Sequence, residues 1–216
     1  MSENSAIIYE NNAGISTITL NRPQKHNAFD DQLIAELIKL LQRIDKDDSV
    51  RVVMLNANGR NFCAGADLNW MKRMAEFSCT ENKADALELA KLLKTMSTLT
   101  KPIIALVHGR IMGGGVGLIA CCDITIAAEN ARFCFSEVKL GLIAATIAPY
   151  VVRSIGFSAA RRYLISAELF DAQNAQQIGL VHQLVAESQL LNAGRELATA
   201  IIQNGPTAIA MSKQML

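Results

Sequence analysis

The sequence is poor in aromatic side chains, which make up 5% of its 216 residues, and it carries almost no net charge. Its 21 basic residues are offset by 20 acidic ones, and the formal net charge of +1 comes without any basic block. Proteins that bind nucleic acid present a basic patch or stripe, often with aromatic side chains on which bases stack. The composition therefore gives no support to nucleic acid as the main partner.

The chain also lacks a long apolar run and a secretory signal. Its longest stretch without Asp, Glu, Lys or Arg, residues 197–212, contains Asn204-Gly205-Pro206 and is shorter than the ~20 apolar residues that span a membrane. The start, MSENSAIIYENN, has no basic segment before an apolar core, so we expect no secretory leader. The five cysteines include no C-x-x-C pair, which predicts reduced, mostly buried thiols. We expect a soluble, cytoplasmic protein with no membrane partner.

What is present is mainly apolar: half of the residues are hydrophobic, which is enough for one sizeable core. Two short runs, residues 6–10 and 14–20, predict an antiparallel hairpin. Asp30 is placed to cap the helix that follows. Strands and helices alternate at first, and later segments are helical. This order predicts an α/β core in residues 1–156 and a helical assembly region in residues 157–216.

Residues 101–123 combine a buried strand with an exposed helix start. Residues 103–107 form a short apolar run rich in β-branched side chains, and three glycines, residues 113–115, then open an apolar helix. Such a helix start presents unpaired N–H groups at the positive end of the helix dipole, and glycine lets a ligand approach the main chain closely. The stretch therefore predicts a site for negative charge.

Two other interpretations of these glycines stay open at this point. They could simply let a strand turn into a helix. Gly115, Gly117 and Ala120 also fit the G-x-G-x-x-A fingerprint of dinucleotide-binding proteins. That match is weak, because the acidic residue Glu129 follows Gly115 sooner than the ~20 residues that the fingerprint requires.

A second exposed helix start follows a second strand. The apolar run of residues 50–56 leads to Ala64-Gly65-Ala66 and then to Asp67, which is placed to cap a short helix over residues 68–75. For Asp67 alone, capping is a more frequent role than a chemical one.

Glu137 stands out because its neighbours Phe133, Phe135 and Val138 are apolar. If its carboxyl group were buried, desolvation would raise its pKa, as proton exchange near neutral pH requires. The alternative is a surface residue at a strand end that pairs with Lys139.

Four motifs in a fixed order cover essentially the whole chain. They are Asn21-Arg22-Pro23 with Asn27-Ala28, residues 62–68, residues 113–123 and residues 136–141. With them, the chain resembles the crotonase superfamily, in particular the enoyl-CoA hydratase and isomerase enzymes. The run Gly65-Ala66-Asp67-Leu68-Asn69-Trp70-Met71 is most similar to the methylglutaconyl-CoA hydratase branch, which works in leucine or acyclic-isoprenoid breakdown.

The resemblance implies a crotonase-type spiral of ββα units with a C-terminal helical region, and a coenzyme A thioester as the substrate. It implies that the thioester oxygen binds between the backbone N–H groups of Ala66 and Gly114, and that Glu137 acts as acid and base. Preorganised donors of this kind contribute about 3–4 kcal/mol each to stabilising an enolate. Coenzyme A enters as part of the substrate, and no metal or redox cofactor is implied. Homotrimers or homohexamers that form through the C-terminal helices are also implied.

The resemblance also places residues against the coenzyme A moiety. The loop around Ala66 lines the coenzyme A groove in family members. Basic residues near the first motif are candidates for its phosphates, with a solvated loop as the alternative. The substrate-binding candidates are Ala64, Asp67, Leu68, Asn69, Gly117, Lys25 and His26.

The chain departs from the family pattern in three places. Many hydratases carry two glutamates; the second corresponds to Glu137, but the first corresponds to Gly117. A single carboxyl group is what the family's isomerases keep, and it recurs in thioester hydrolases. Residues 144–150 replace a glycine-rich run, which predicts a differently shaped acyl cavity. The chain stops at Leu216, where relatives continue, so we expect a truncated assembly region or a different assembly.

We therefore predict an enoyl-CoA hydratase that adds water across the α,β double bond of an enoyl-CoA, with a branched or carboxylated, methylglutaconyl-like acyl group. The alternatives are an isomerase that converts 3-enoyl to 2-enoyl thioesters with the single glutamate, a thioester hydrolase, and a subunit that binds acyl-CoA without catalysis.

Overall fold

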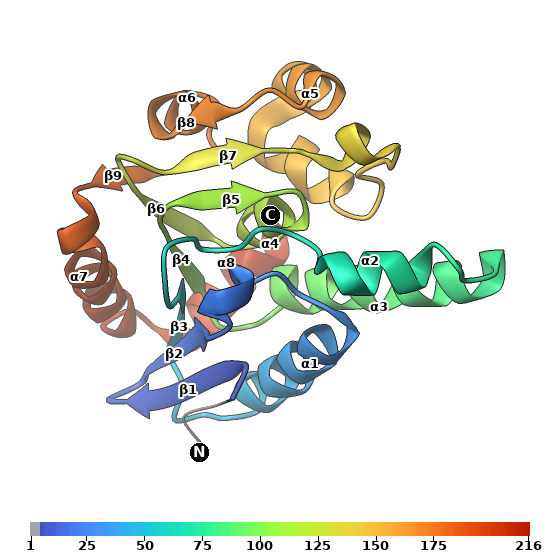
Figure 1. Cartoon of the computed structure of the whole chain (residues 1–216). Coiled ribbons are helices and arrows are strands. Elements are labelled where there is room, and N and C mark those ends of the chain that lie inside the picture. Colours follow the sequence, from blue (N-terminus) through green and yellow to red (C-terminus); the bar gives the residue numbers. More distant parts are fainter. Residues whose placement is uncertain (1–4) are drawn as a thin grey trace.

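The computed structural model describes residues 5–216 (Figure 1). Residues 1–4 lie outside the described residues. They belong to the start of the chain, where we expect no secretory leader. The chain folds into mixed α/β structure, as the alternation of apolar patterns predicts.

Six strands of the described chain form one sheet in the order β1-β2-β3-β4-β6-β9. β1 and β2 make the predicted antiparallel hairpin, and every later neighbour pairs in parallel. The central strands β3, β4 and β6 are covered on both faces, so their sequences are largely apolar rather than alternating. The strands are β1 Ile7–Asn12, β2 Ile15–Leu20, β3 Val52–Ala57, β4 Ile103–Val107, β6 Ile124–Ala128 and β9 Gln183–Val185.

Three short strands of residues 5–216 form a second sheet in the order β5-β7-β8: β5 Arg110–Met112, β7 Arg132–Cys134 and β8 Phe170–Asp171. A bridge between Cys63 and Ile111 ties the loop after β3 to this sheet. β4, β5 and α4 are followed by β6, β7 and α5, so two ββα units succeed one another. The sequence does not predict β5, β8 or β9, because strands of two or three residues are too short to show a period.

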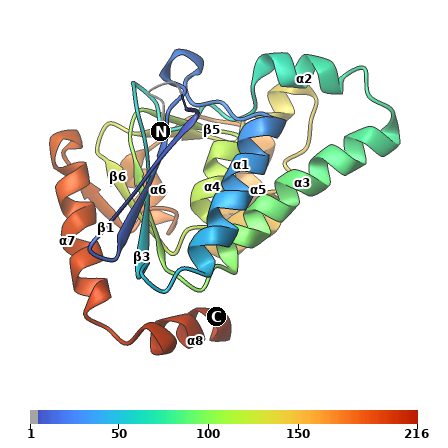
Figure 2. The same ribbon diagram turned by 90° about the horizontal axis from the view of Figure 1, so that it is seen from below.

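Helices cover both faces of the main sheet (Figure 2). α1 Asp31–Asp45, α3 Cys79–Ser97 and α4 Gly114–Ala120 lie on one face, and α7 Leu190–Ile202 lies on the other. α1 begins at the predicted cap, where Asp30 Oδ1 accepts a hydrogen bond from the N–H of Leu33 at 3.0 Å. α7 approaches the sheet closely, because a Cβ on Gly194 would lie 2.7 Å from the methyl groups of Leu106.

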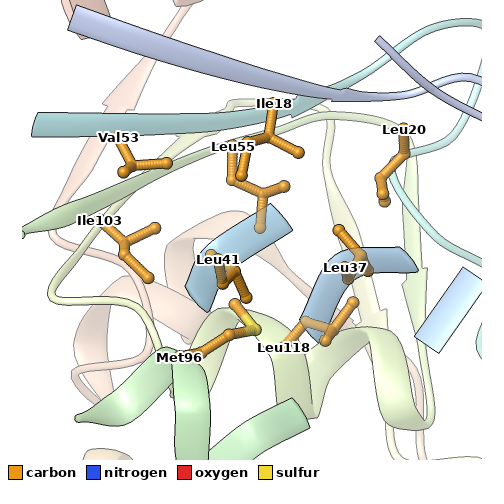
Figure 3. A pocket seen from close by; sticks show the side chains of 9 residues that line it. All are labelled: Ile18, Leu20, Leu37, Leu41, Val53, Leu55, Met96, Ile103 and Leu118. Atoms are coloured by element: carbon orange, nitrogen blue, oxygen red, sulfur yellow. The ribbon is translucent and has the colours of Figure 1, made fainter. Parts of the chain in front are cut away.

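The side chains that surround a small gap between the sheet and α1, α3 and α4 are all apolar (Figure 3). The gap measures about 10 Å³, which is at most the space of one water molecule and offers it no polar partner. It is therefore a packing imperfection and not a ligand site. It is lined by Ile18, Leu20, Leu37, Leu41, Val53, Leu55, Met96, Ile103 and Leu118.

The sequence predicts two helices over residues 147–155 and 158–165, and the structure joins them as α5 Ala148–Ser166. The helix breaks at Gly156, whose φ of 74° lies in the left-handed region that glycine adopts without strain. The remaining α-helices of the described chain are α2 Leu68–Met74, α6 Ala172–Gln177 and α8 Pro206–Met215, and short 3-10 helices span Pro23–Lys25, Glu137–Leu140 and Glu187–Gln189.

α8 stands apart at the lower edge of Figure 2 and contains no buried residue. Lys213 connects it to the body of the protein through an ion pair with Asp123, with 2.6 Å between nitrogen and oxygen. The division at residue 156 and the assembly role of residues 157–216 stay predictions. No helix within residues 5–216 is both long and apolar enough to cross a membrane. The predicted mostly buried thiols are found, since Cys63, Cys121 and Cys134 are buried and form no disulfide.

Candidate active site

The first glycine-rich turn, residues 64–67, is held by Phe29. The N–H of Phe29 donates to Gly65 O at 2.9 Å, and the N–H of Asp67 donates to Phe29 O at 2.8 Å. In such a parallel pairing, the residue between the two partners points its own N–H and C=O the other way. The N–H of Ala66 accordingly finds no acceptor within residues 5–216.

Asp67 fixes the orientation of this turn. Its Oδ1 accepts hydrogen bonds from the N–H groups of Asn69 at 2.8 Å and Trp70 at 3.3 Å, so the predicted cap of α2 is confirmed. Its Oδ2 pairs with Lys25 Nζ at 2.9 Å and with Arg22 at 3.5 Å. The hydrogen bond from Lys25 lowers the pKa of Asp67, which stays ionised although its side chain is almost fully buried.

The second glycine-rich turn, residues 112–115, begins α4. Gly113 caps the helix with φ 50° and ψ −124° and donates its N–H to Cys134 O at 2.8 Å. Gly114 is the first helical residue, so its N–H has no partner within the helix. A Cβ on Gly65 would lie 3.0 Å from Met112 O and 3.8 Å from Gly114 N. The two turns therefore meet, and only glycine at position 65 permits the approach.

Glu137 faces this meeting point. It begins the 3-10 helix Glu137–Leu140, and its Oε1 lies 3.3 Å from the position that a Cβ on Gly113 would occupy. Its Oε2 is buried and has no hydrogen-bond partner among the described residues. Burial raises the pKa of Glu137 above its ordinary value. The carboxyl group is thus desolvated, as the sequence suggested. Within the described chain it forms no ion pair with Lys139, whose Nζ approaches Cys134 Sγ instead.

All three predicted catalytic groups line one cavity of about 310 Å³. This volume is at the lower end of the range for small-molecule sites. The predicted residues Ala64, Ala66, Leu68, Gly114 and Glu137 line it. Ala144, Thr146 and Ile147 also line it and belong to residues 144–150, from which the sequence predicts a differently shaped acyl cavity. Most of the other lining residues are not predicted, because helix periodicity shows which residues are apolar but not which of them face a cavity. These others are Phe29, Gly65, Trp70, Met71, Met74, Asp85, Ala86, Leu89, Gly113, Ser136, Leu140, Leu142 and Ile143.

The remaining substrate-binding candidates lie outside the cavity wall. Asp67 and Asn69 belong to the cap of α2, and Lys25 is engaged with Asp67. His26 Nδ1 lies 3.0 Å from the side-chain nitrogen of Asn61. These residues border the turn that carries Ala66, so a role at the entrance of the cavity stays a prediction.

Gly117 is buried inside α4 and does not line the cavity. A Cβ at this position would overlap with Ile147 Cγ2, and Ile147 does line the cavity. The place where many family members have a water-activating glutamate is therefore filled by an aliphatic side chain from a different segment.

The chain is similar to known proteins over nearly its whole length. The model of the Enoyl-CoA hydratase/isomerase family matches residues 10–216. The chain belongs to the enoyl-CoA hydratase/isomerase family. The short-chain-enoyl-CoA hydratase of Clostridium acetobutylicum is 34% identical over 97% of this chain and 80% of its own length. The 2,3-dehydroadipyl-CoA hydratase of Escherichia coli is 34% identical over 98% of this chain and 82% of its own length.

Solved structures agree with this assignment of the family. A Legionella pneumophila protein described in the enoyl-CoA hydratase/isomerase (crotonase) group is 48% identical, with a TM-score of 0.95, over 98% of this chain and 82% of that one. An enoyl-CoA hydratase of Shewanella pealeana is 44% identical, with a TM-score of 0.94, over 97% of this chain and 78% of that one.

The predicted superfamily, crotonase fold and enzyme class are therefore confirmed. The family also includes isomerases: a Delta(3,5)-Delta(2,4)-dienoyl-CoA isomerase of Dictyostelium discoideum is 30% identical over 94% of this chain and 72% of its own length. Membership of the methylglutaconyl-CoA hydratase branch stays a prediction.

Proposed function

We propose that this family member hydrates a 2-enoyl-CoA thioester, with Glu137 as acid and base and with the N–H groups of Ala66 and Gly114 as donors to the thioester oxygen. The observation that carries the proposal is that two unpaired N–H groups and one desolvated carboxyl group line the same cavity. This is the combination that an enolate intermediate needs: donors at the developing negative oxygen and a proton carrier beside the carbon atoms.

The reaction proceeds by addition of water to the β-carbon. The Glu137 carboxylate accepts a proton from the water molecule while the oxygen of that water bonds to the β-carbon. Negative charge then moves to the thioester oxygen. Ala66 and Gly114 donate to that oxygen. The carboxyl group of Glu137 then gives its proton to the α-carbon, which restores the carboxylate and the thioester. Because Ile147 occupies the space beside Gly117, the mechanism uses one carboxyl group for both proton transfers.

Of the two predicted acyl classes, we propose the branched, uncharged one. Within the described chain no Lys, Arg or His side chain lines the cavity, so a carboxylated acyl group would lack a cation and would lie in the same cavity as Glu137. An unpaired buried charge is costly. The names of the relatives differ in their acyl groups, and the carboxylated class stays a prediction that a substrate screen tests.

Coenzyme A enters as part of the substrate in this proposal, and no metal or redox cofactor takes part. We propose that Lys25 contacts the coenzyme A phosphates. In support, 42% of its side chain is exposed beside the turn that carries Ala66. His26, Asn69 and Asp67 are proposed to shape the same entrance. A homotrimer or homohexamer and a cytoplasmic location are further proposals, which sedimentation and cell fractionation test.

The test is an activity screen of wild-type protein and Glu137→Gln against straight, branched and carboxylated 2-enoyl-CoAs. Removing the proton carrier should lower kcat by about 10²- to 10⁴-fold. Glu88→Gln is the matched control, because Glu88 is exposed on α3, pairs with Lys91 and does not line the cavity. If Glu137→Gln hydrates every substrate as fast as the wild-type protein does, the assignment is wrong.

Isomerisation of 3-enoyl to 2-enoyl thioesters is the second candidate, because a single carboxyl group also suffices for it. Proton-exchange NMR in deuterated water separates the two reactions: an isomerase exchanges α-protons and interconverts the isomers without forming a hydroxyacyl product. Thioester hydrolysis would release a free thiol. A binding subunit without catalysis would bind acyl-CoA tightly in calorimetry and would convert none of these substrates.

A further inference from the structure

A second carboxyl group, Asp85 of α3, also lines the cavity. Glu137 and Asp85 are the two ionisable side chains of its wall within residues 5–216. Asp85 Oδ1 accepts a hydrogen bond from Trp70 Nε1 at 3.3 Å. Its Oδ2 is buried and has no partner in the described chain. One oxygen of Asp85 is therefore held in place, and the other is available to a ligand.

The surroundings of Asp85 do not explain it as part of an ion pair. Desolvation raises its pKa, and the hydrogen bond from Trp70 and the charge of Arg73 act in the opposite direction. Arg73 itself pairs with Asp31 at 2.8 Å, and Asp31 adds a repulsive charge near Asp85. A buried carboxyl oxygen without a partner costs stability, so a compensating role for it is expected.

Contacts between aromatic rings place Asp85 away from the reacting atoms. The ring of Phe29 lies directly against Gly114, where a Cβ would touch it. The ring centroids of Phe29 and Trp70 are 6.2 Å apart, and Trp70 then bonds to Asp85. Two aromatic rings thus separate Asp85 from the donors at the thioester oxygen. This chain of contacts favours a position of Asp85 beside the acyl chain over one beside the carbon atoms next to the thioester.

We propose that Asp85 is a specificity-determining residue that binds a hydroxyl group on the acyl chain; this rests on the proposed function of the cavity. A hydroxyl group can donate to the ionised carboxylate and accept from the protonated acid, so it suits Asp85 in either state. A carboxylate on the acyl chain would be repelled by the ionised form. An acyl chain without a polar group would leave Oδ2 unpaired.

The experiment compares two branched 2-enoyl-CoAs with the same carbon skeleton, one with a hydroxyl group near the end of the chain and one without it. We expect the wild-type protein to prefer the hydroxylated substrate by about tenfold or more in kcat/KM, as a hydrogen bond to a charged group predicts. Asp85→Leu should remove this preference by lowering kcat/KM for the hydroxylated substrate alone. Asp85→Asn, which keeps an acceptor for Trp70, should keep part of it.

The proposal is overturned if the wild-type protein does not discriminate between the two substrates, or if Asp85→Leu slows both equally. Glu88→Gln, on an exposed position of the same helix, should leave the preference unchanged. If neither substrate turns over, hydration is refuted, but the role of Asp85 is still measured by calorimetry with the two saturated acyl-CoAs. Equal affinities for these two ligands would then refute the role of Asp85 independently. Thermal unfolding of each variant verifies that it is folded.

Discussion

The packing of Gly117 against Ile147 offers a sharp test of how the cavity beside Glu137 is built. Gly117 lies inside α4, and a Cβ there would overlap with Ile147 Cγ2 and lie 2.8 Å from Ile147 Cβ. If glycine is needed to make room for Ile147, then Gly117→Ala should be harmful in the wild-type background. It should be less harmful once Ile147 has been shortened to alanine.

The structure allows the magnitudes to be worked out. Overpacking by one methyl group costs about 1–3 kcal/mol, and alanine in a helix regains about 0.5–1 kcal/mol over glycine. Gly117→Ala should therefore destabilise the protein by up to roughly 2.5 kcal/mol. Ile147 is 2% exposed, so Ile147→Ala should cost about 2–5 kcal/mol. In the double variant the overlap with Cγ2 is gone and only the 2.8 Å approach to the Cβ of residue 147 remains, so the coupling energy should be about 1–2 kcal/mol in favour of the pair.

The assay is urea unfolding of the wild-type protein, both single variants and the double variant, with equal m-values as the condition for comparison. Gly194→Ala combined with Ile147→Ala is the control, because Gly194 packs against Leu106 on the other face of the sheet and its effect should be additive. A coupling energy within about 0.5 kcal/mol of zero for Gly117 and Ile147 would refute the reasoning.

Three further predictions concern the groups around the proposed site of the thioester oxygen. Because burial raises the pKa of Glu137, the folded state binds more protons than the unfolded state between the two pKa values, and stability falls as pH rises. Glu137→Gln should thus gain thermal stability over the wild-type protein at about pH 8, and this gain should shrink towards about pH 4. Gly113→Ala should lower kcat at least tenfold and cost about 1–3 kcal/mol in urea unfolding, since φ is 50° and the new Cβ would lie 3.3 Å from Glu137 Oε1; wild-type kcat would contradict this. Asp67→Asn should reduce stability at neutral pH and lose this effect as pH falls through the lowered pKa of Asp67; a loss independent of pH in urea titrations would show that the ion pair with Lys25 contributes nothing.

Local signals in the sequence were sufficient for several elements. The caps Asp30 and Asp67 are decided by side chains that accept hydrogen bonds from backbone N–H groups two or three residues away. The hairpin of β1 and β2 and the start of α4 follow instead from short turns that contain glycine. The short strands β5, β8 and β9 could not be predicted, because their pairing depends on partners far away in the chain.

The sequence by itself determined the family, through four ordered motifs, and the candidates Ala66, Gly114 and Glu137. It also showed that no glutamate stands at position 117. Only the tertiary structure decided that two turns meet across Gly65 and that Asp85 of α3 shares a cavity with Glu137. The physical reason is that motifs report the local geometry of the backbone, whereas a cavity wall is assembled from segments that become neighbours only when the sheet and its helices have packed.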